Sequence, residues 1–308
     1  MNYTLPQLKM FVTIAQTQSI TRAAEELHLT QPAISVQLKN FQDQFDLPLT
    51  EIIGRQLYLT EFGKEVAIAA QRVLDEINKI DSLTAAHKGQ LSGTLKISSV
   101  SIGNYVMPYF LSGFMESNPG VELLLDVTDK KDVVESLEKN EVDFALVSVL
   151  PEKLTLEKME LIDNKLVLVG NAQAKFPQKI SPKSLLEKLP LIYRERGSGS
   201  RLLMEEFLNK SNLKVKKKME LTTNESVKQA VIAGLGYAIV PLISLKNELR
   251  FHDLQIIPVK GLPIQTNWYL VWLKGKKFSP IAQAYLNYLQ KNKTQIVKDN
   301  FSWHDQWS

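Results

Sequence analysis

The apolar residues of the first 60 positions fall into three helical patterns followed by a short extended segment. After Thr4 they recur at spacings of three and four over residues 5–15. Two more helices are expected at residues 20–27 and 31–45, because Ser19 and Thr30 are good N-cap residues and Pro32 fits a first helical turn. Residues 51–59 then form an extended piece that bends at residues 54–55. This order predicts a winged helix-turn-helix in residues 1–59.

A long helical pattern with a heptad repeat begins after Thr60 and ends near residues 88–93, where we place a hinge. Its apolar positions alternate spacings of four and three, which is typical of a helix that pairs with a second copy. The alternative is a helix packed against its own domain. We therefore assign residues 60–90 to a linker and dimerisation helix, with this seam: Val66, Ala70, Val73, Ile77 and Ile80.

Beyond the hinge, β-branched and apolar runs alternate with helical patterns. Strands without in-out alternation, separated by helices, favour a parallel sheet covered on both faces. Two such sets predict an α/β effector domain at residues 91–308. Its first lobe would comprise residues 91–165 and 267–308, and its second residues 166–266. Open α/β sheets bind ligands at the carboxyl ends of their strands.

Composition narrows the class of protein. With 44% hydrophobic and 23% charged residues, the chain has the make-up of an ordinary globular protein. It has no cysteine, which excludes disulfides and thiolate chemistry. The amino terminus shows no secretion signal and no long apolar run occurs, so we expect a cytoplasmic protein that contacts no membrane.

Residues 1–60 contain four basic and five acidic residues, so charge does not support binding of nucleic acid there. Geometry does. On a helical wheel Ile34, Leu38 and Phe41 face inward, and the opposite face of that helix is small, polar and weakly charged. Such a face suits the major groove of DNA, whereas the alternative is a plain three-helix bundle. The candidate DNA contacts are Thr30, Gln31, Pro32, Ala33, Ser35, Val36, Lys39 and Arg55.

Small polar residues gather at the predicted strand ends of both lobes, where hydroxyls and free N–H groups suit an anion. Taken singly, each is an ordinary N-cap. The segment 193–201 surrounds a Gly-Ser-Gly-Ser loop with arginines, which predicts an anion site or else a flexible connector. The candidate effector contacts are Ser99, Val100, Ser101, Thr128, Ser148, Arg196, Ser198, Thr223 and Asn224.

Catalysis finds no support in the sequence. The four histidines are isolated and form no metal-ligand spacing, and no G-x-S-x-G nucleophile motif occurs. We expect a protein that is not an enzyme and that has no metal and no cofactor.

The block "FVTIAQTQSITRAAEELHLTQPAISVQLKNF", followed by "GRQLYLTEFG", resembles the DNA-binding head of LysR-type transcriptional regulators. Thr50 stands where that family usually has Phe, and Ile52 where a basic wing residue is common. Arg55 remains as the expected minor-groove residue. The resemblance implies a regulator that reads double-stranded operator DNA.

The segments "SIGNYVMPYFLSGF", "ESVKQAVIAGLG" and "GLPIQTNWYLVW" resemble the effector domain of the same family, with a fold like that of type 2 periplasmic binding proteins. They are most similar to the subgroup that regulates carbon-fixation and sulfur-assimilation genes. The resemblance implies a homodimer, usually assembled into a homotetramer. From the polar residues at the strand ends we expect a small and anionic effector, and RNA polymerase is a candidate further partner. The rival interpretation is a solute-binding or enzymatic clamshell whose first helices serve only oligomerisation.

Overall fold

The computed structural model describes residues 3–54, 56–87, 91–174 and 186–307. The chain divides into two compact units, Met1–Gly89 and Gln90–Ser308. Within the described residues, none of the helices is both long enough and apolar enough to cross a membrane.

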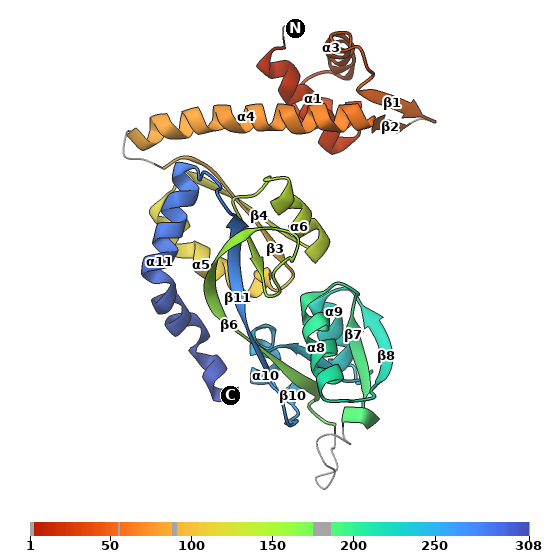
Figure 1. The fold of residues 1–308 in the computed structure, drawn as a ribbon, viewed down its shortest axis with the longest axis vertical. Coiled ribbons are helices and arrows are strands. Elements are labelled where there is room, and N and C mark those ends of the chain that lie inside the picture. The colour runs from red at the N-terminus through yellow and green to blue at the C-terminus, as the bar shows by residue number, and fades with distance from the viewer. Residues whose placement is uncertain (1–2, 55, 88–90, 175–185, 308) are drawn as a thin grey trace. The chain divides into compact units, whose positions relative to one another are not determined.

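The first unit has the winged helix-turn-helix order that the apolar pattern predicts (Figure 1). Its elements are α1 (Leu5–Thr17), α2 (Ile20–Glu26), α3 (Gln31–Gln42), β1 (Thr50–Ile53), β2 (Gln56–Leu59) and α4 (Glu61–His87). The Ser19 hydroxyl accepts a hydrogen bond from the Arg22 N–H and so caps α2. Thr30 occupies the N-cap position of α3 without a side-chain capping bond, and α3 ends three residues earlier than expected.

The core of this unit forms between the inward faces of its helices. Ile34, Leu38 and Phe41 are buried, as the helical wheel predicts, and pack with Phe11 of α1. The start of α4 also packs here: a Cβ atom on Gly63 would lie 1.9 Å from the carbonyl oxygen of Leu49. Only glycine allows α4 to approach the segment before the wing this closely.

The second unit is an α/β domain of two lobes (Figure 1). In chain order its elements are β3 (Gly93–Val100), α5 (Gly103–Ser117), β4 (Val121–Thr128), α6 (Lys130–Glu138), β5 (Phe144–Val147), β6 (Leu156–Asn171), β7 (Pro190–Arg194), α8 (Gly199–Lys210), β8 (Lys216–Leu221), α9 (Asn224–Ile232), β9 (Ala238–Pro241), η1 (Leu242–Ser244), α10 (Lys246–Arg250), β10 (Leu254–Ile256), β11 (Ile264–Leu273), α11 (Pro280–Phe301) and η2 (Ser302–Trp307).

The sheet of this unit is mixed, whereas the sequence predicted parallel strands throughout. Among the described residues β3 pairs in parallel with β4 and β5, and β7 with β8. Strands β6 and β11 form a long antiparallel ladder from Ile264 opposite Leu166 to Leu273 opposite Leu156. The chain leaves the first lobe along β6 and returns along β11. Two neighbouring strands that run out and back must be antiparallel, so this part of the prediction is wrong.

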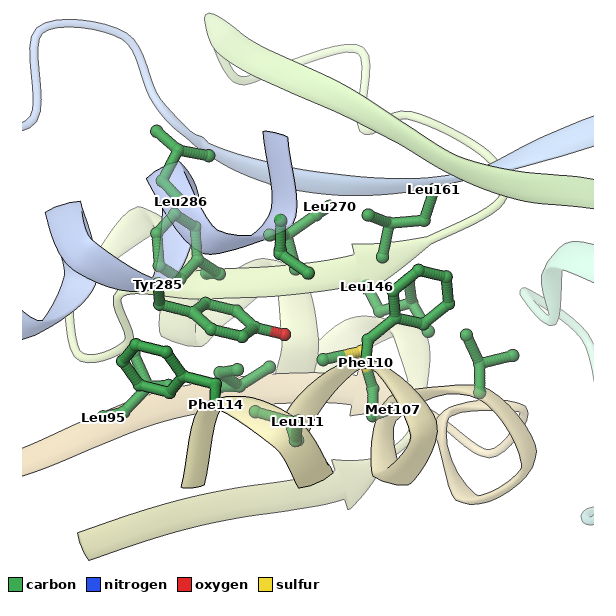
Figure 2. Packing of buried hydrophobic residues seen from close by; sticks show 14 of the residues in the cluster. Leu95, Met107, Phe110, Leu111, Phe114, Leu146, Leu161, Leu270, Tyr285 and Leu286 are labelled. Carbon is green, nitrogen blue, oxygen red and sulfur yellow. The ribbon is translucent and has the colours of Figure 1, made fainter. Parts of the chain in front are cut away.

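Each lobe has its own hydrophobic core on this shared ladder. In the first lobe, α5 and α11 pack around the sheet through Phe110, Phe114 and Tyr285, together with Leu270 of β11 (Figure 2). In the second lobe, β6 contributes alternate residues to two clusters, one on each face of the sheet. Each lobe therefore has a core of its own, and β6 and β11 run through both lobes.

The carboxyl-terminal segment is more ordered than the sequence suggests. A helix is expected at residues 279–290, but α11 continues to Phe301 and is followed by η2. Phe301 is buried in the core of the first lobe, and Trp303 packs against a core cluster of the second. The end of the chain thus touches both lobes.

Candidate functional site

A cavity of about 220 Å³ opens where strand ends and helix starts of the two lobes meet. Residues 100–102, 127–130 and 147–149 line it from the first lobe, and residues 194–195, 198–200 and 222–224 from the second. Trp268 of β11 completes the wall. The cavity lies at the carboxyl ends of β3, β4 and β5, as expected for an open α/β sheet.

Four helices begin at this cavity. The lining includes the N-cap or first residues of α5, α6, α8 and α9, two helices from each lobe. The N-terminus of a helix carries partial positive charge and unsatisfied N–H groups. Four sets of helix N–H dipoles therefore point their positive ends toward the cavity.

Seven of the nine effector candidates line the cavity: Val100, Ser101, Thr128, Ser148, Ser198, Thr223 and Asn224. Ser99 and Arg196 are outside the lining. Ser99 is fully buried, its hydroxyl donates to the carbonyl oxygen of Val100, and its side chain packs on Gly103. Arg196 is exposed at the tip of the loop before α8. Ser99 and Arg196 lie one or two residues from positions that line the cavity. The sequence pattern does not show which of these neighbouring side chains points into the cavity.

Arg194 lines the cavity and is held by a carboxylate of the same chain. Its guanidinium makes two 2.7 Å hydrogen bonds to Glu195, and a 2.5 Å bond to Asn224 Oδ1. The other arginine near the loop, Arg201, turns away from the cavity toward Glu205 and Glu220. Lys217 and Arg201 together lower the pKa of Glu220 to about 2. Both arginines are therefore already paired in this structure.

Lys130, which the sequence analysis did not select, is the second cation in the lining. Burial lowers the pKa of its ammonium below the ordinary lysine value, with a smaller opposing influence from Glu152. A signal for it exists in the sequence: Lys130 follows the N-cap Asp129, where the helix dipole disfavours a positive charge.

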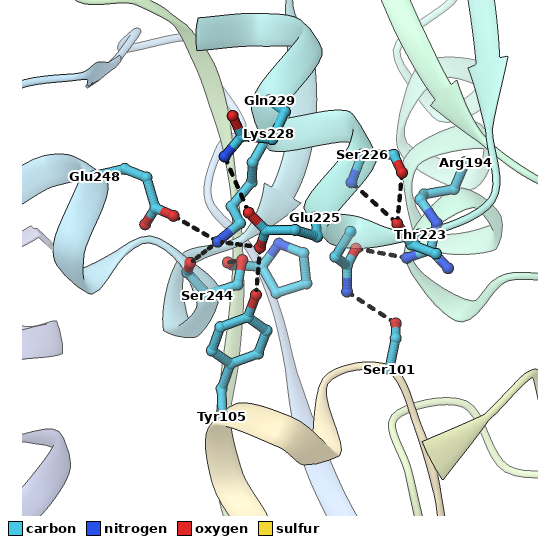
Figure 3. Close-up of polar contacts among 12 residues, drawn as sticks. Ser101, Tyr105, Arg194, Thr223, Glu225, Ser226, Lys228, Gln229, Ser244 and Glu248 are labelled. Atoms are coloured by element: carbon cyan, nitrogen blue, oxygen red, sulfur yellow. Dashed lines mark hydrogen bonds and ion pairs between the residues drawn. The ribbon is translucent and has the colours of Figure 1, made fainter.

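Two polar contacts join the lobes beside the cavity (Figure 3). Asn224 Nδ2 donates to Ser101 Oγ over 3.1 Å, and the Tyr105 hydroxyl donates to Glu225 Oε2 over 3.0 Å. Glu225 also pairs with the buried Lys228 at 2.9 Å, and this hydrogen bond is the main reason that the pKa of Glu225 is lowered. Burial opposes the charge of Lys228, but its hydrogen bonds to Glu248 and Glu225 outweigh burial and raise the pKa of Lys228. The lobe contact at Tyr105 is therefore anchored on a charged network.

In the first unit, α3 exposes a small, polar surface. Thr30, Gln31, Pro32, Val36 and Lys39 are exposed. Ala33 and Ser35 are half-buried, and Gln31 Nε2 donates to Ser35 Oγ over 3.1 Å. Arg55 lies outside the described residues. The candidate DNA contacts on α3 thus share one accessible face.

The predicted seam of α4 divides into two parts. Val66 packs against the core of its own unit and Ala70 is buried, so these two positions follow the alternative of a helix packed on its own domain. Val73 and Ile80 are exposed, and Ile77 is half-buried. Apolar surface available for pairing is therefore confined to the second half of the seam.

Two family models match the chain, one at each end. Residues 5–64 match the family described as "Bacterial regulatory helix-turn-helix protein, lysR family", and residues 88–293 match the "LysR substrate binding domain". The HTH-type transcriptional activator CmpR of Synechocystis sp. is 37% identical over 290 residues, 94% of this chain and 95% of CmpR. The RuBisCO operon transcriptional regulator of Allochromatium vinosum is 36% identical over 291 residues, 94% of this chain and 96% of that relative.

Two solved structures are similar in fold. The CcmR regulatory domain of Synechocystis PCC6803, in complex with 2-PG, has a TM-score of 0.61 and 29% identity, and the match covers 68% of this chain and 99% of that domain. Full-length CbnR, complexed with its target DNA, has a TM-score of 0.70 at 21% identity and covers 94% of this chain and 99% of CbnR. The curated relatives are named as transcriptional regulators, not as enzymes.

Proposed function

The chain belongs to the LysR family of DNA-binding transcriptional regulators, and we propose that its effector is a small anion bound in the cavity between the two lobes. The observation that carries the proposal is the convergence of four helix N-termini on a cavity of about 220 Å³. That volume suits a metabolite of a few to about a dozen non-hydrogen atoms. The regulator is not an enzyme.

The ligand of a relative supports this assignment. CcmR, 29% identical to this chain over the matched domain, was solved with 2-PG. In this chain, Ser101, Thr128 and Ser148 line the cavity with hydroxyl side chains from the first lobe, and the first turns of α8 and α9, where backbone N–H groups have no partner within the helix, line it from the second. A ligand that contacts both sets prefers the lobe arrangement in which both are within reach, and that preference is what allows binding to shift a conformational equilibrium.

The DNA-binding end of the proposal rests on α3. We assign Gln31 and Ser35 to hydrogen bonds with base edges, Ala33 and Val36 to contact with a thymine methyl group, and Lys39 to contact with phosphate. Thr30, Pro32 and Arg55 complete the proposed surface. With so few charges, one head binds weakly, so we propose a homodimer that joins two heads through α4 and assembles further into a tetramer.

The remaining partners follow from the family. A regulator that acts on operator DNA works in the compartment that holds the chromosome, so we place the protein in the cytoplasm. A contact with RNA polymerase is part of the same proposal. The domain limits proposed from the sequence, residues 1–59, 60–90 and 91–308, fit these three tasks of DNA reading, pairing and effector binding.

Filling the cavity tests the effector site. Ser148→Phe places a ring in the space where the effector would bind, and Ser112→Phe places the same ring on the exposed face of α5. Isothermal calorimetry with 2-PG should show binding to the wild type and to Ser112→Phe, and a loss of at least about 100-fold, on the order of 3 kcal/mol, for Ser148→Phe. Equal binding by both variants would place the effector elsewhere.

A further inference from the structure

Two cations line the effector cavity among the residues that the structure describes, and they differ in what surrounds them. Arg194 is buried and forms the two 2.7 Å hydrogen bonds to Glu195. Lys130 forms no hydrogen bond or ion pair with any described residue, and its electrostatic neighbour is Glu152. The wall therefore holds one cation in an ion pair and one that has no ion-pair partner among the described residues.

The position of Lys130 is unfavourable in two independent ways. It is the first residue of α6, so its ammonium sits at the end of the helix where the dipole is positive. It is also half-buried, and the removal of water disfavours its charged form, which is why the pKa of Lys130 is lowered. A residue that breaks a local rule twice is expected where binding of a ligand compensates the cost.

The acidic groups around the cavity do not offset this cost, because the influence of Glu152 is smaller than that of burial and the other carboxylates have partners of their own. Asp129 uses its side chain to cap α6, by accepting from the N–H of Asp132. Glu195 is turned to Arg194. The hydroxyl of Thr128 donates to Asp132, so this carboxylate also has a partner within the helix start. An anion that enters the cavity thus meets Lys130 as the one unpaired cation among the lining residues described.

We propose that Lys130 determines the charge selectivity of the cavity by forming a direct ion pair with the negative group of the effector. This inference rests on the proposed function, because it assumes that the effector binds in this cavity. It goes further by assigning the selectivity to one residue and by excluding Arg194, Arg196 and Arg201 from that role. The ligand class is a small anion whose negative group reaches the start of α6.

The chain offers a matched control in the neighbouring residue. Lys131 is exposed, follows Lys130 in the same helical turn, and is not part of the cavity wall. Lys130→Gln and Lys131→Gln each remove one positive charge from the start of α6, so they change net charge and the interaction with the helix dipole alike. They differ in that the charge of Lys130 is half-buried in the cavity wall, whereas that of Lys131 is exposed outside it.

The experiment is calorimetry on the full-length protein with 2-PG and with inorganic phosphate as probes. Loss of a charge-assisted contact predicts binding about 10- to 100-fold weaker for Lys130→Gln. Lys131→Gln should stay within about twofold of wild type, and Lys130→Arg, which restores the charge, should recover most of the affinity.

The outcomes separate this inference from the proposed function. If Lys130→Gln binds as wild type does while Ser148→Phe fails to bind, the cavity is the effector site but Lys130 does not select the charge. If both lysine variants weaken binding equally, the effect is one of net charge and the inference is wrong. A wild type that binds neither probe contradicts the inference and the anionic effector together.

Discussion

The identity of a single residue is most constrained where two segments of the backbone pack too closely for a larger side chain. Gly63 is the clearest case, because the space for its missing Cβ is occupied by the Leu49 backbone. The glycine stands in the "GRQLYLTEFG" segment that resembles the LysR family, and the structure supplies its physical reason. Ser99 and Arg196 are a second example, because each lies outside the cavity wall although a residue next to it or two positions away lines the cavity.

Gly63→Ala should destabilise the DNA-binding unit by about 1 to 3 kcal/mol, since neither the Leu49 carbonyl nor α4 can move without losing core contacts. Lys64→Ala is the control, because it removes only the exposed pair with Glu61. All four tryptophans lie after residue 267, so urea unfolding of this unit has to be followed by far-UV circular dichroism. If both variants unfold at the same urea concentration, the close approach of α4 to Leu49 at Gly63 does not determine the stability of this unit.

At the scale of elements, the contact between α5 and α9 holds the lobes together outside the cavity (Figure 3). Tyr105→Phe keeps the ring beneath Lys228, 5.1 Å from its centroid, but removes the hydroxyl that donates to Glu225. We expect a loss of about 1 kcal/mol in the stability of the effector domain at neutral pH. Tyr109→Phe, one turn further along α5 and exposed, is the control.

This loss should depend on pH. The pKa of Glu225 is lowered in the folded protein, so the stabilisation that depends on its charge is complete above the ordinary glutamate value and disappears as the pH falls through the lower folded-state value. Wild type and Tyr105→Phe should therefore differ at pH 7 and converge toward roughly pH 3. A difference that stays constant over this range in urea unfolding followed by tryptophan fluorescence would show that Glu225 is not the partner that matters.

The second half of the α4 seam, at Val73, Ile77 and Ile80, is available for contact with a second copy of the chain. Ile77→Asp introduces a charge into the proposed dimer contact, where its desolvation is not compensated, and should give monomers with weakened binding to DNA. Arg72→Glu changes the charge in the same direction at an exposed position about 140° around α4 from Ile77, and should leave the dimer intact. Sedimentation velocity that shows an unchanged dimer for Ile77→Asp would remove this half of α4 from the interface.

The positions of many helices and of their buried faces could be predicted from the spacing of apolar residues and N-caps along the chain. The helix start at Ser19 and the inward face of α3 depend on local spacing and capping, and both agree with the structure. The antiparallel direction of β11 was missed because direction depends on where the chain returns, which apolar spacing does not encode. Pairing of Arg194 with Glu195 and the unpaired state of Lys130 were missed for a similar reason, since both depend on side-chain directions in the folded protein.

The central claim about the whole molecule is that an anion in the cavity and operator DNA on the winged helices influence each other through one protein. Coupling between two binding sites is reciprocal, so it can be measured from either side. The most direct measurement is the Kd for 2-PG of the full-length protein, determined by calorimetry with and without a saturating operator fragment obtained by selection from genomic DNA. We expect operator DNA to change this Kd by about 5- to 150-fold. Identical Kd values for the free and the DNA-bound protein would contradict it.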